Sequence, residues 1–479
     1  MRRFVLASLL LGLALAQEPR VVGVHTLPPT PIQALNPFLS PQEVEAALKG
    51  GWPTAQRPSL GSGLFYLGNG RFVGLTDRGP NGDCPGGKFF PLPRFAPTLA
   101  FFRLGEGAIL LEKTLFLRNL GGKPLTGLPN RPSEDIPFAD KACRERLPLD
   151  PDGLDTEDVA VAPGGAFWLV EEHSPSLVYA DPWGRVLMRY TPKGLRPGAS
   201  YPVRDVLPSV LALRRNNRGL ENLALSGDGK TAWALLQSPI GPTSDPGFDR
   251  SLVARAVRLD VADPLRVRVT GMYLVPFSDP KAYPKPNRPR DMKFSAAAWL
   301  GDERILLLER AEGGARIFVV DFARATNLLG HPEGESPELD KAGVDYAAKG
   351  IALPERRLLL ETWGLPEVDT DKLEGLALLE DGQTMASWTT TTSPSPARRA
   401  RTASGWCGSP RGFARRLAGA QRPAPWLCNM KGPPWGPLVL PPSPYPNAQE
   451  SPFGAPALAF GTQDPGRSPK PPRPRRGGP

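Results

Sequence analysis

The stretch EDVAVAPGGAFWLVEE, residues 157–172, holds two short apolar runs joined by a Gly-bearing turn. Other stretches follow the same plan: SGLFYLGNGRFVGLTD (62–77), ENLALSGDGKTAWALLQ (221–237), EGLALLEDGQTMA (374–386) and, more loosely, SAAAWLGDERILLLER (295–310). Turns such as Gly68-Asn69-Gly70 tolerate the positive φ values that tight hairpins need. Each stretch is therefore predicted to be a β-hairpin.

A hairpin that recurs along a long chain predicts an all-β fold, the β-propeller, in which each four-stranded blade places its first strand along a central channel. The copies begin 95, 64, 74 and 79 residues apart, so we expect further blades between them that carry no visible copy. Five to seven blades would fit, and we predict six. Helical patterning is sparse apart from Pro41–Lys49.

The N-terminus has the layout of a secretory signal peptide. Arg2 and Arg3 precede an apolar run from Phe4 to Leu15, and small residues lie before Gln17. The run is shorter than the ~20 apolar residues of a membrane span, which is the alternative interpretation. We therefore expect residues 1–16 to be removed near Ala16-Gln17, giving a secreted or periplasmic chain without a transmembrane span.

The positive charge of the chain is concentrated at its C-terminal end. The formal net charge is +10, yet residues 388–479 hold 13 Lys and Arg against only Glu450 and Asp464. This surplus of 11 exceeds the net charge of the whole chain, so residues 1–387 are close to neutral. A nucleic-acid partner, which a basic protein would favour, is therefore not expected.

Residues 388–479 also contain 20 prolines and no periodic apolar pattern, which predicts a disordered tail. The codons of Trp388 to Ser393, read two bases later, encode Asp, then three residues drawn from Asp, Asn, His or Tyr, then Phe, Leu, Ile or Val. We infer a frameshift near residues 385–388, which would leave the last blade incomplete. A genuine basic, Pro-rich appendage is the alternative.

Cysteine and histidine use limits the metal chemistry. Export permits a disulfide between Cys84 and Cys143, and a reduced pair remains the alternative. The spacing does not resemble a metal-binding CxxC pair. The three histidines, His25, His173 and His331, are too few and too scattered for a histidine-based metal centre.

Five segments resemble a known family, the esterase-like phytase family, in its order. They are LTDRGPN (75–81), FPLPRFAP (90–97), GLDTEDVAVAPGGAFWLVEEHSPSL (153–177), NNRGLENLALSGDGKTAWALLQSP (216–239) and KLEGLALLEDG (372–382). The resemblance implies a phytase-like propeller domain over residues 17–387 that hydrolyses phosphate esters with a metal. It also implies an acidic string of the type Asn-Asp-Asn-Asp-Phe after the last hairpin, which the shifted reading frame allows.

Three glutamates occupy the same place in three hairpins, at the start of the strand that should line the channel: Glu157, Glu221 and Glu374. Converging carboxylates repel one another and raise one another's pKa values, and a hard cation such as Ca²⁺ resolves this repulsion. We therefore predict that these three residues are metal ligands. Alternatively, they bond backbone amides or Arg218 and hold blades together.

A second group of candidates comes from an irregular turn after the first hairpin. Asp77, Arg78 and Asn81 lie beside Gly79-Pro80, and an arginine offers a planar fork suited to phosphate. Arg218, three residues before Glu221, is a second candidate anion clamp. We predict that Arg78, Asn81 and Arg218 bind substrate, and that Asp77, Arg78 and Arg218 are catalytic; simple salt bridges are the alternative.

Glu171 and Glu172 are the remaining catalytic candidates, as general base or metal ligand. The resemblance is imperfect here, because the family usually carries Asp-Glu-Tyr-Gly where this chain has Glu171-Glu172-His173-Ser174. The longer Glu171 changes the reach of the carboxylate. Both glutamates could instead cap a strand in solvent.

These residues favour a metal-assisted hydrolase in which water attacks a small phosphorylated substrate in the channel of a monomer. No GxSxG elbow, Walker loop or HExxH motif is present in the sequence, so serine-hydrolase, nucleotide and zinc-protease chemistry have no support. A propeller that binds a ligand or a cell-envelope partner without catalysis is the alternative, because a fold does not fix a function.

Overall fold

The computed structural model describes most of residues 19–389 and one later strand. The residues outside the description are 1–18, 53–59, 133–134, 302, 366–367, 369–371, 390–425 and 430–479. The expected signal peptide and most of the expected tail therefore lie outside it. Among the described residues, no helix is long and apolar enough to cross a membrane.

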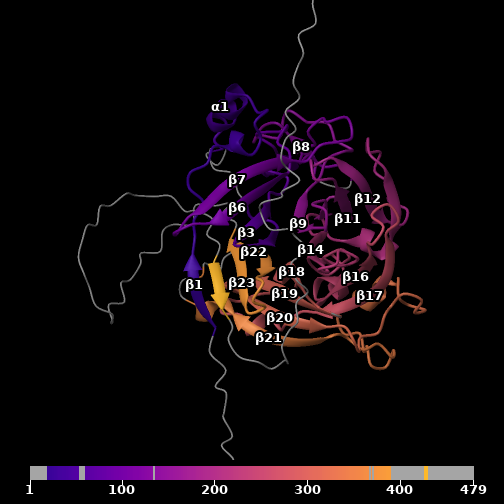
Figure 1. Ribbon diagram of the computed structural model, residues 1–479. Coiled ribbons are helices and arrows are strands. Elements are labelled where there is room, and N and C mark those ends of the chain that lie inside the picture. Colours follow the sequence, from indigo (N-terminus) through magenta and orange to yellow (C-terminus); the bar gives the residue numbers. More distant parts are fainter. Residues whose placement is uncertain are drawn as a thin grey trace, which may run out of the picture. The chain divides into compact units, whose positions relative to one another are not determined.

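Five sheets make up the body, and each contains one of the five hairpins (Figure 1). The first blade consists of β2 (Leu64–Gly68), β3 (Arg71–Leu75), β6 (Thr98–Leu104) and β7 (Ile109–Phe116). The second consists of β9 (Thr156–Val161), β10 (Phe167–Glu171), β11 (Ser176–Ala180) and β12 (Val186–Pro192), with β13 (Val203–Leu207) added parallel to β12.

The other three blades have four strands each. The third consists of β14 (Leu220–Leu225), β15 (Thr231–Leu236), β16 (Val253–Asp260) and β17 (Arg268–Pro276). The fourth consists of β18 (Lys293–Gly301), β19 (Arg304–Ala311), β20 (Gly314–Asp321) and β21 (Glu355–Glu361). The fifth consists of β22 (Leu373–Leu378), β23 (Thr384–Thr389), β24 (Trp426–Asn429) and β1 (Arg20–Val24).

The first strands of the blades form a ring. They contact one another in the order β2, β9, β14, β18 and β22, and β22 contacts β2 in turn. Figure 1 shows β9, β14, β18 and β22 near the middle, with β17 and β21 farther out. The β-propeller that the hairpins predicted is thus confirmed.

The number of blades corrects the sequence prediction, since the described residues form five blades and not six. Each hairpin opens one blade. The long intervals hold third and fourth strands and, after β3, a small sheet of β4 (Gly82–Cys84), β5 (Gly87–Phe89) and β8 (Pro137–Phe138). No blade without a hairpin copy is needed to account for them.

Asp158 joins neighbouring blades at the ring. Its side chain is buried and accepts hydrogen bonds from the backbone N–H groups of Val159 on β9 and Leu223 on β14, both at 2.8 Å. Gly63 approaches the same residue so closely that a Cβ atom there would lie 2.7 Å from the Cα atom of Asp158. Blades one, two and three therefore meet around one side chain.

The fifth blade differs from the incomplete blade that we expected. Strand β24 pairs with β23 on one side and with the N-terminal strand β1 on the other, so the sheet has four strands. Strand pairing depends on backbone groups, and the short run Trp-Leu-Cys-Asn can supply them without family-specific side chains. The frameshift remains a prediction, which resequencing codons 384–390 tests.

Trp388 anchors the fifth blade to the first. It lies on β23, is 1% exposed, and stacks on Phe102 of β6 with ring centroids 5.6 Å apart. Gly74 on β3 makes room for the indole, because a Cβ atom there would lie 1.8 Å from the ring. The junction that closes the ring is thus a packed aromatic contact.

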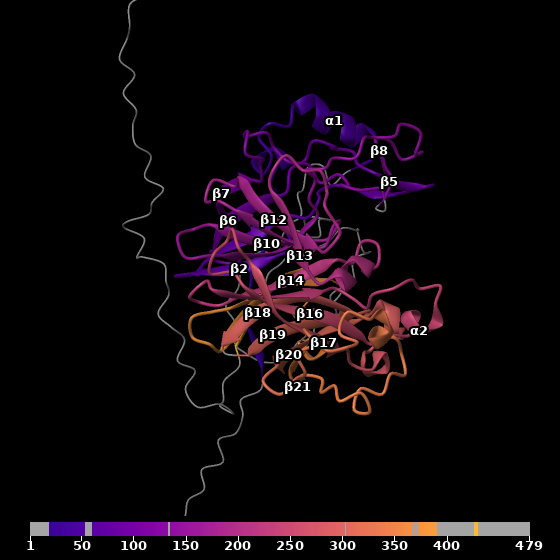
Figure 2. The same cartoon turned by 90° about the vertical axis from the view of Figure 1, so that its right-hand side faces the viewer.

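A layer outside the propeller is built on the first blade. Helix α1 (Pro41–Lys49), where the sequence showed helical patterning, begins with a capping box between Ser40 and Glu43. Its buried Val44 and Ala47 pack in one cluster with Leu92 and Phe95. Figure 2 shows α1 near the small sheet of β5 and β8 at one side of the body, whereas helix α2 (Pro246–Asp249) lies elsewhere.

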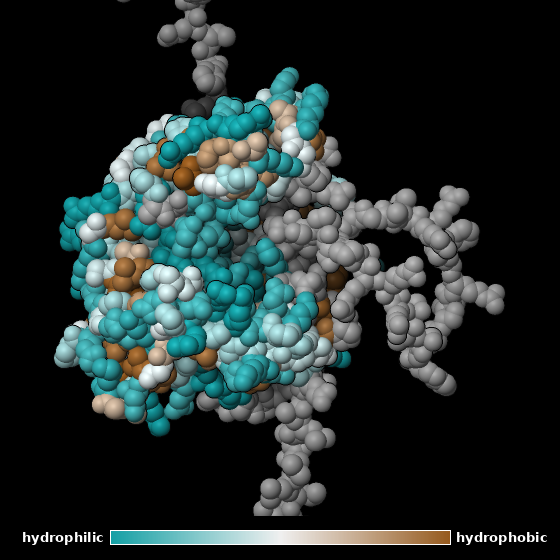
Figure 3. Space-filling model, turned by 180° about the vertical axis from the view of Figure 1, so that it is seen from behind, coloured by the Kyte–Doolittle hydropathy of each residue, from teal (hydrophilic) through white to brown (hydrophobic). Residues whose placement is uncertain are grey.

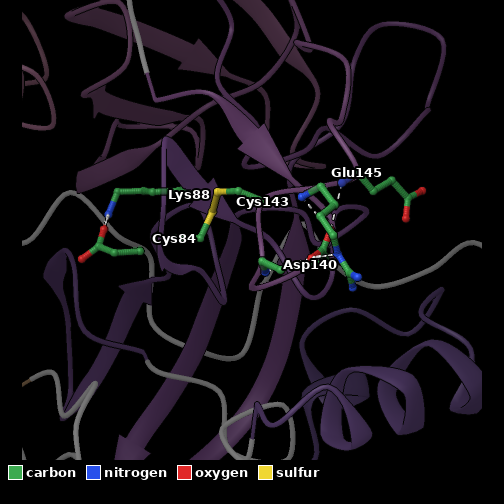
Figure 4. Close-up of a disulfide and its surroundings, with 8 residues drawn as sticks. Cys84, Lys88, Asp140, Cys143 and Glu145 are labelled. Carbon is green, nitrogen blue, oxygen red and sulfur yellow. Dashed lines mark hydrogen bonds and ion pairs between the residues drawn. A yellow bond between two sulfur atoms is a disulfide. The ribbon is translucent and has the colours of Figure 1, made fainter.

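Cys84 at the end of β4 forms a disulfide with Cys143 (Figure 4). Asp140, three residues before Cys143, accepts hydrogen bonds from the backbone N–H groups of Ala142 and Glu145 at 2.8 and 2.9 Å. The disulfide that the sequence left open is therefore present. It joins the insertion between β3 and β6 to the segment between β7 and β9.

Replacing Cys84 with serine should lower the free energy of unfolding by about 2–4 kcal/mol, because the disulfide closes a loop between residues 59 positions apart. Urea denaturation measures the change. The comparison needs Cys407→Ser and Cys428→Ser in both proteins, so that tail thiols cannot form new bridges. Equal unfolding midpoints with and without Cys84 would contradict a stabilising crosslink.

The face of the molecule in Figure 3 is largely hydrophilic, with hydrophobic residues in small separate patches. The largest single exposed hydrophobic side chain among the described residues is Trp183, which is 61% exposed. Scattered apolar residues of this kind are ordinary on soluble surfaces. They give no argument for a docking face.

Candidate functional site

The three glutamates of the repeat lie at equivalent places in the ring. Glu157, Glu221 and Glu374 are each the second residue of the first strand of a blade, on β9, β14 and β22. The repeat pattern thus located the strand ends correctly. The structure nevertheless groups these carboxylates differently from the metal site that the sequence predicted.

The acidic trio consists of Asp155, Glu157 and Glu172. One carboxylate oxygen from each lies within 4.8 Å of the others, and among the described residues no other such group of potential metal ligands is found. Glu157 thus belongs to the close group, whereas Glu221 and Glu374 do not. Asp155, which the sequence analysis did not single out, takes their place.

Local backbone structure brings the trio together. Asp155 and Glu157 are two residues apart at the start of β9, so their side chains share one face of the strand. Glu172 follows β10, and its backbone N–H donates to the carbonyl of Asp155 at 2.9 Å. The N–H of Gly219 donates to the Glu172 carboxylate at 3.2 Å, and a Cβ atom at Gly219 would lie 2.5 Å from the Glu172 carbonyl oxygen.

Burial and mutual repulsion govern the protonation of the trio. Burial and then the carboxylate of Glu221 raise the pKa values of Glu157 and Glu172 well above their ordinary range. Burial would also raise the pKa of Asp155, but the charges of Arg78 and His173 and the hydrogen bonds to this carboxylate together outweigh burial and hold that pKa below its usual value. Without a cation, Glu157 and Glu172 therefore keep protons that free carboxyls lose, whereas Asp155 loses its proton readily.

Arg78 is the internal counterion of the trio. Its Nε lies 3.2 Å from Asp155 Oδ2 and its Nη1 lies 3.6 Å from Asp135 Oδ2, while its backbone N–H donates to Asp155 Oδ1 at 3.1 Å. The side chain is 6% exposed. Arg78 therefore positions Asp155, and most of its fork is already engaged.

The two other candidates in this turn have different surroundings. Asp77 accepts from the N–H of Gly79 at 2.8 Å, and Asn81 donates to the carbonyl of Gly79 at 2.9 Å, so both shape the turn. Burial and then the charge of Asp155 raise the pKa of Asp77 to about 6. Asp77 therefore lies within electrostatic reach of the trio, and its proton exchanges near neutral pH.

Glu171 lies in a separate buried cluster. Its carboxylate pairs with Arg189 at 2.8 Å and accepts hydrogen bonds from Ser176 Oγ at 3.0 Å and Asn130 Nδ2 at 3.2 Å. Both partners of the ion pair are fully buried. This geometry gives Glu171 a structural setting, because both of its carboxylate oxygens are engaged by buried partners and it is not a member of the trio.

Glu374 and Glu221 both have the basic residue Arg310 among their neighbours. Glu374 forms an ion pair with Arg310 at 2.6 Å. Glu221 Oε2 is buried and accepts no hydrogen bond. Burial and then the charge of Glu374 raise the pKa of Glu221 to about 7.

A divalent cation fits the trio. All of its donors are carboxylate oxygens, which Ca²⁺ prefers at 2.3–2.6 Å. Asp155 Oδ2 is buried without a hydrogen bond, so it has unused acceptor capacity despite its approach to Arg78. His173 Nδ1 lies 4.0 Å from the same oxygen and its Nε2 contacts the Gly127 carbonyl, so it borders the trio.

The signal for Asp155 was present in the sequence. The string Asp155-Thr156-Glu157 places two carboxylates at positions i and i+2, which share a face in any strand. The copy of the repeat that we compared began at Glu157 and so excluded Asp155. Glu172 was a candidate from the sequence. Its position beside the start of β9 depends on the pairing of β10 with β9, which the sequence does not show.

Replacing Glu221 with glutamine should stabilise the metal-free protein above pH 7. A carboxyl whose folded pKa is about 7 contributes stability at pH values below its unfolded pKa near 4.5, and this stability is lost as pH rises through about 7. The variant should therefore exceed the wild type by about 2–3 kcal/mol at pH 8 and show no gain at pH 4.5. Urea denaturation with chelator at both pH values measures this.

Glu45→Gln is the matched control, because Glu45 is an exposed partner of Lys49 on α1. It should change stability little at either pH. A Glu221→Gln variant whose stability tracks the wild type from pH 4.5 to pH 8 would contradict the raised pKa.

Comparisons with known proteins supply the family. Residues 60–387 match the family described as phytase-like, esterase-like activity of phytase. An uncharacterized secreted protein from Arthroderma benhamiae is 28% identical over 185 residues, which cover 32% of this chain and 35% of that protein. The chain thus matches about a third of the length of this relative.

Solved structures show weaker likeness. PhoX from Pseudomonas fluorescens, in complex with vanadate, is 10% identical with a TM-score of 0.35 and covers 86% of this chain and 94% of that chain. The calcium-binding protein regucalcin from Agrobacterium tumefaciens is 13% identical with a TM-score of 0.31 and covers 69% and 82%. The family match spans more than half of the sequence, and the chain therefore belongs to the phytase-like family.

Proposed function

We propose that this protein hydrolyses phosphate esters with the help of a divalent cation, Ca²⁺, held by Asp155, Glu157 and Glu172. The observation that carries the proposal is the acidic trio itself, three carboxylates within 4.8 Å in a member of the phytase-like family. Without a cation, Glu157 and Glu172 have raised pKa values, because burial and neighbouring carboxylates disfavour their charged forms, so the arrangement favours cation binding.

A cation bound there would supply Lewis acidity towards a phosphoryl oxygen and lower the pKa of a water molecule. The chain's residues perform the remaining tasks. Arg78 orients Asp155 through its Nε and backbone N–H contacts. Glu172 is held by the Gly219 N–H, which aims one carboxylate oxygen and leaves the other for the cation.

Asp77 is the proposed general base. Its pKa of about 6 is matched to proton transfer near neutral pH, and it responds to the charges of Asp155 and Glu374. A carboxylate in this position can accept the proton of an attacking water. Asn81 shapes the same turn, and Arg218 lies one residue before the Gly219 contact of Glu172.

We also propose that the protein works outside the cytoplasm as a monomer. The disulfide between Cys84 and Cys143 favours an oxidising compartment, and the matched relative from Arthroderma benhamiae is a secreted protein. The signal-peptide layout of residues 1–16 supports export. The substrate class is a small molecule with an accessible phosphate ester.

The test is hydrolysis of para-nitrophenyl phosphate by the full chain, before chelation, after chelation and after Ca²⁺ is restored. We expect turnover that chelator removes and Ca²⁺ restores. Para-nitrophenyl acetate, assayed in parallel, separates phosphatase from carboxylesterase activity. No phosphatase activity with Ca²⁺ bound to the trio would favour the ligand-binding alternative and overturn the proposal.

A further inference from the structure

Two basic residues at the starts of the neighbouring inner strands β14 and β18 have unused hydrogen-bond donors. Lys293 begins β18, where its Cα atom pairs with that of Arg310 on β19. Like charges directly opposite one another on neighbouring strands are unfavourable. Arg310 is compensated by Glu374 at 2.6 Å, whereas Lys293 makes no hydrogen bond or ion pair with any residue that the structure describes.

Arg218 is the second of these residues. Its Nη1 donates to the carbonyl of Arg290 at 2.6 Å, and it has no ion pair within the described part of the chain. An arginine has five N–H donors, so most of the fork remains available. Arg218 and Lys293 are both half-buried, which leaves them accessible to a small ligand.

Geometry places Arg218 between the trio and Lys293, because its guanidinium donates to the carbonyl of Arg290, three residues before Lys293, and the next residue, Gly219, contacts Glu172. Arg310, then burial, then Arg218 lower the pKa of Lys293 to about 8. The carboxylate of Glu172 is the main charge that favours protonated Arg218. The peptide after Arg218 also contacts Glu172, since the Gly219 N–H donates to that carboxylate. Basic and acidic groups therefore adjoin at this end of the ring.

We propose that Lys293 and Arg218 form an anion subsite beside the acidic trio and that it binds the phosphoryl oxygens of a phosphate ester. This inference rests on the proposed function, which it extends by naming residues that hold the substrate. A bound dianion would offset the repulsion between Lys293 and its basic neighbours. It would also occupy donors that the protein leaves unused.

The geometry of the donors favours phosphate over carboxylate. The arginine fork engages two oxygens at once, and the lysine ammonium acts as a point charge on a third. A phosphate monoester has three terminal oxygens that can accept from both residues together. A carboxylate has two, so it satisfies the fork and leaves the ammonium without a partner.

The experiment measures binding of inorganic phosphate to the full chain by titration calorimetry, with Ca²⁺ and with chelator. Lys293→Met and Arg218→Ala should each weaken phosphate binding about tenfold or more, because each removes a charged hydrogen bond. Lys230→Met is the matched control, since Lys230 lies exposed in a hairpin turn and pairs with Asp228. It should bind phosphate as the wild type does.

Lys293→Arg keeps the charge and should restore most of the affinity, which separates a binding role from a purely structural one. Ca²⁺ affinity, measured in the same proteins, should change less than phosphate affinity. Unchanged phosphate affinity in both Lys293→Met and Arg218→Ala would overturn the subsite, even if the wild type hydrolyses esters. Weakened phosphate binding in a protein that hydrolyses no ester would support the subsite and overturn only the proposed function.

Discussion

Replacing Glu157 with glutamine is expected to raise the Ca²⁺ concentration for half-maximal phosphatase activity by about 100-fold. The substitution keeps the shape of the side chain but removes one of the three charges of the trio. The affinity of a site for Ca²⁺ depends on the charge of its ligands. Loss of a residue that only hydrogen-bonds to a metal ligand commonly lowers metal affinity about 10–100-fold. Activity measured against free Ca²⁺ gives the shift directly.

The matched control is Glu45→Gln, which makes the same chemical change on the exposed face of α1. It should have the Ca²⁺ dependence of the wild type. At saturating Ca²⁺ the Glu157→Gln variant should regain activity, because the trio still offers oxygen ligands. A variant with wild-type Ca²⁺ dependence would show that Glu157 is not a ligand.

Replacing Trp388 with alanine is expected to lower the free energy of unfolding by about 3–5 kcal/mol. The indole is fully buried, stacks on Phe102 and fills the space that Gly74 leaves open. Its loss leaves a cavity between the fifth and first blades, where the ring closes. Urea denaturation of the full chain measures the effect.

Trp183→Ala serves as the control, because Trp183 is 61% exposed and its truncation creates no cavity. Its stability should lie within about 0.5 kcal/mol of the wild type. If both tryptophan variants unfolded at the same urea concentration, the packing of Trp388 against the first blade would not contribute to ring closure.

The sequence predicted the inner strands of the propeller well, because hairpin turns and apolar runs are local signals. As expected, residues 157–172 form the hairpin of β9 and β10, and residues 221–237 form the hairpin of β14 and β15. The number of blades was inferred from the lengths of chain between the hairpins. No local signal distinguishes a further blade in such a length from an insertion such as β4 and β5. The pairing of β24 with β1 joins segments about 400 residues apart, so no local pattern could predict it.

The candidate site was predicted in part. The equivalent positions in the repeat identified Glu157. The expectation that the glutamates of three blades share one metal did not consider the basic residues on neighbouring strands. Arg310 engages Glu374, and this cross-blade ion pair was not visible in the sequence. Glu171 was indistinguishable from Glu172 until strand pairing turned one towards Arg189 and the other towards the trio.

Anomalous scattering from crystals grown with Ca²⁺ tests the central claim most directly. The account predicts an anomalous difference peak about 2.3–2.6 Å from carboxylate oxygens of Asp155, Glu157 and Glu172, which disappears in Glu157→Gln crystals at the same Ca²⁺ concentration. A peak at other residues, or no peak in crystals of protein that hydrolyses the phosphate ester, would contradict it.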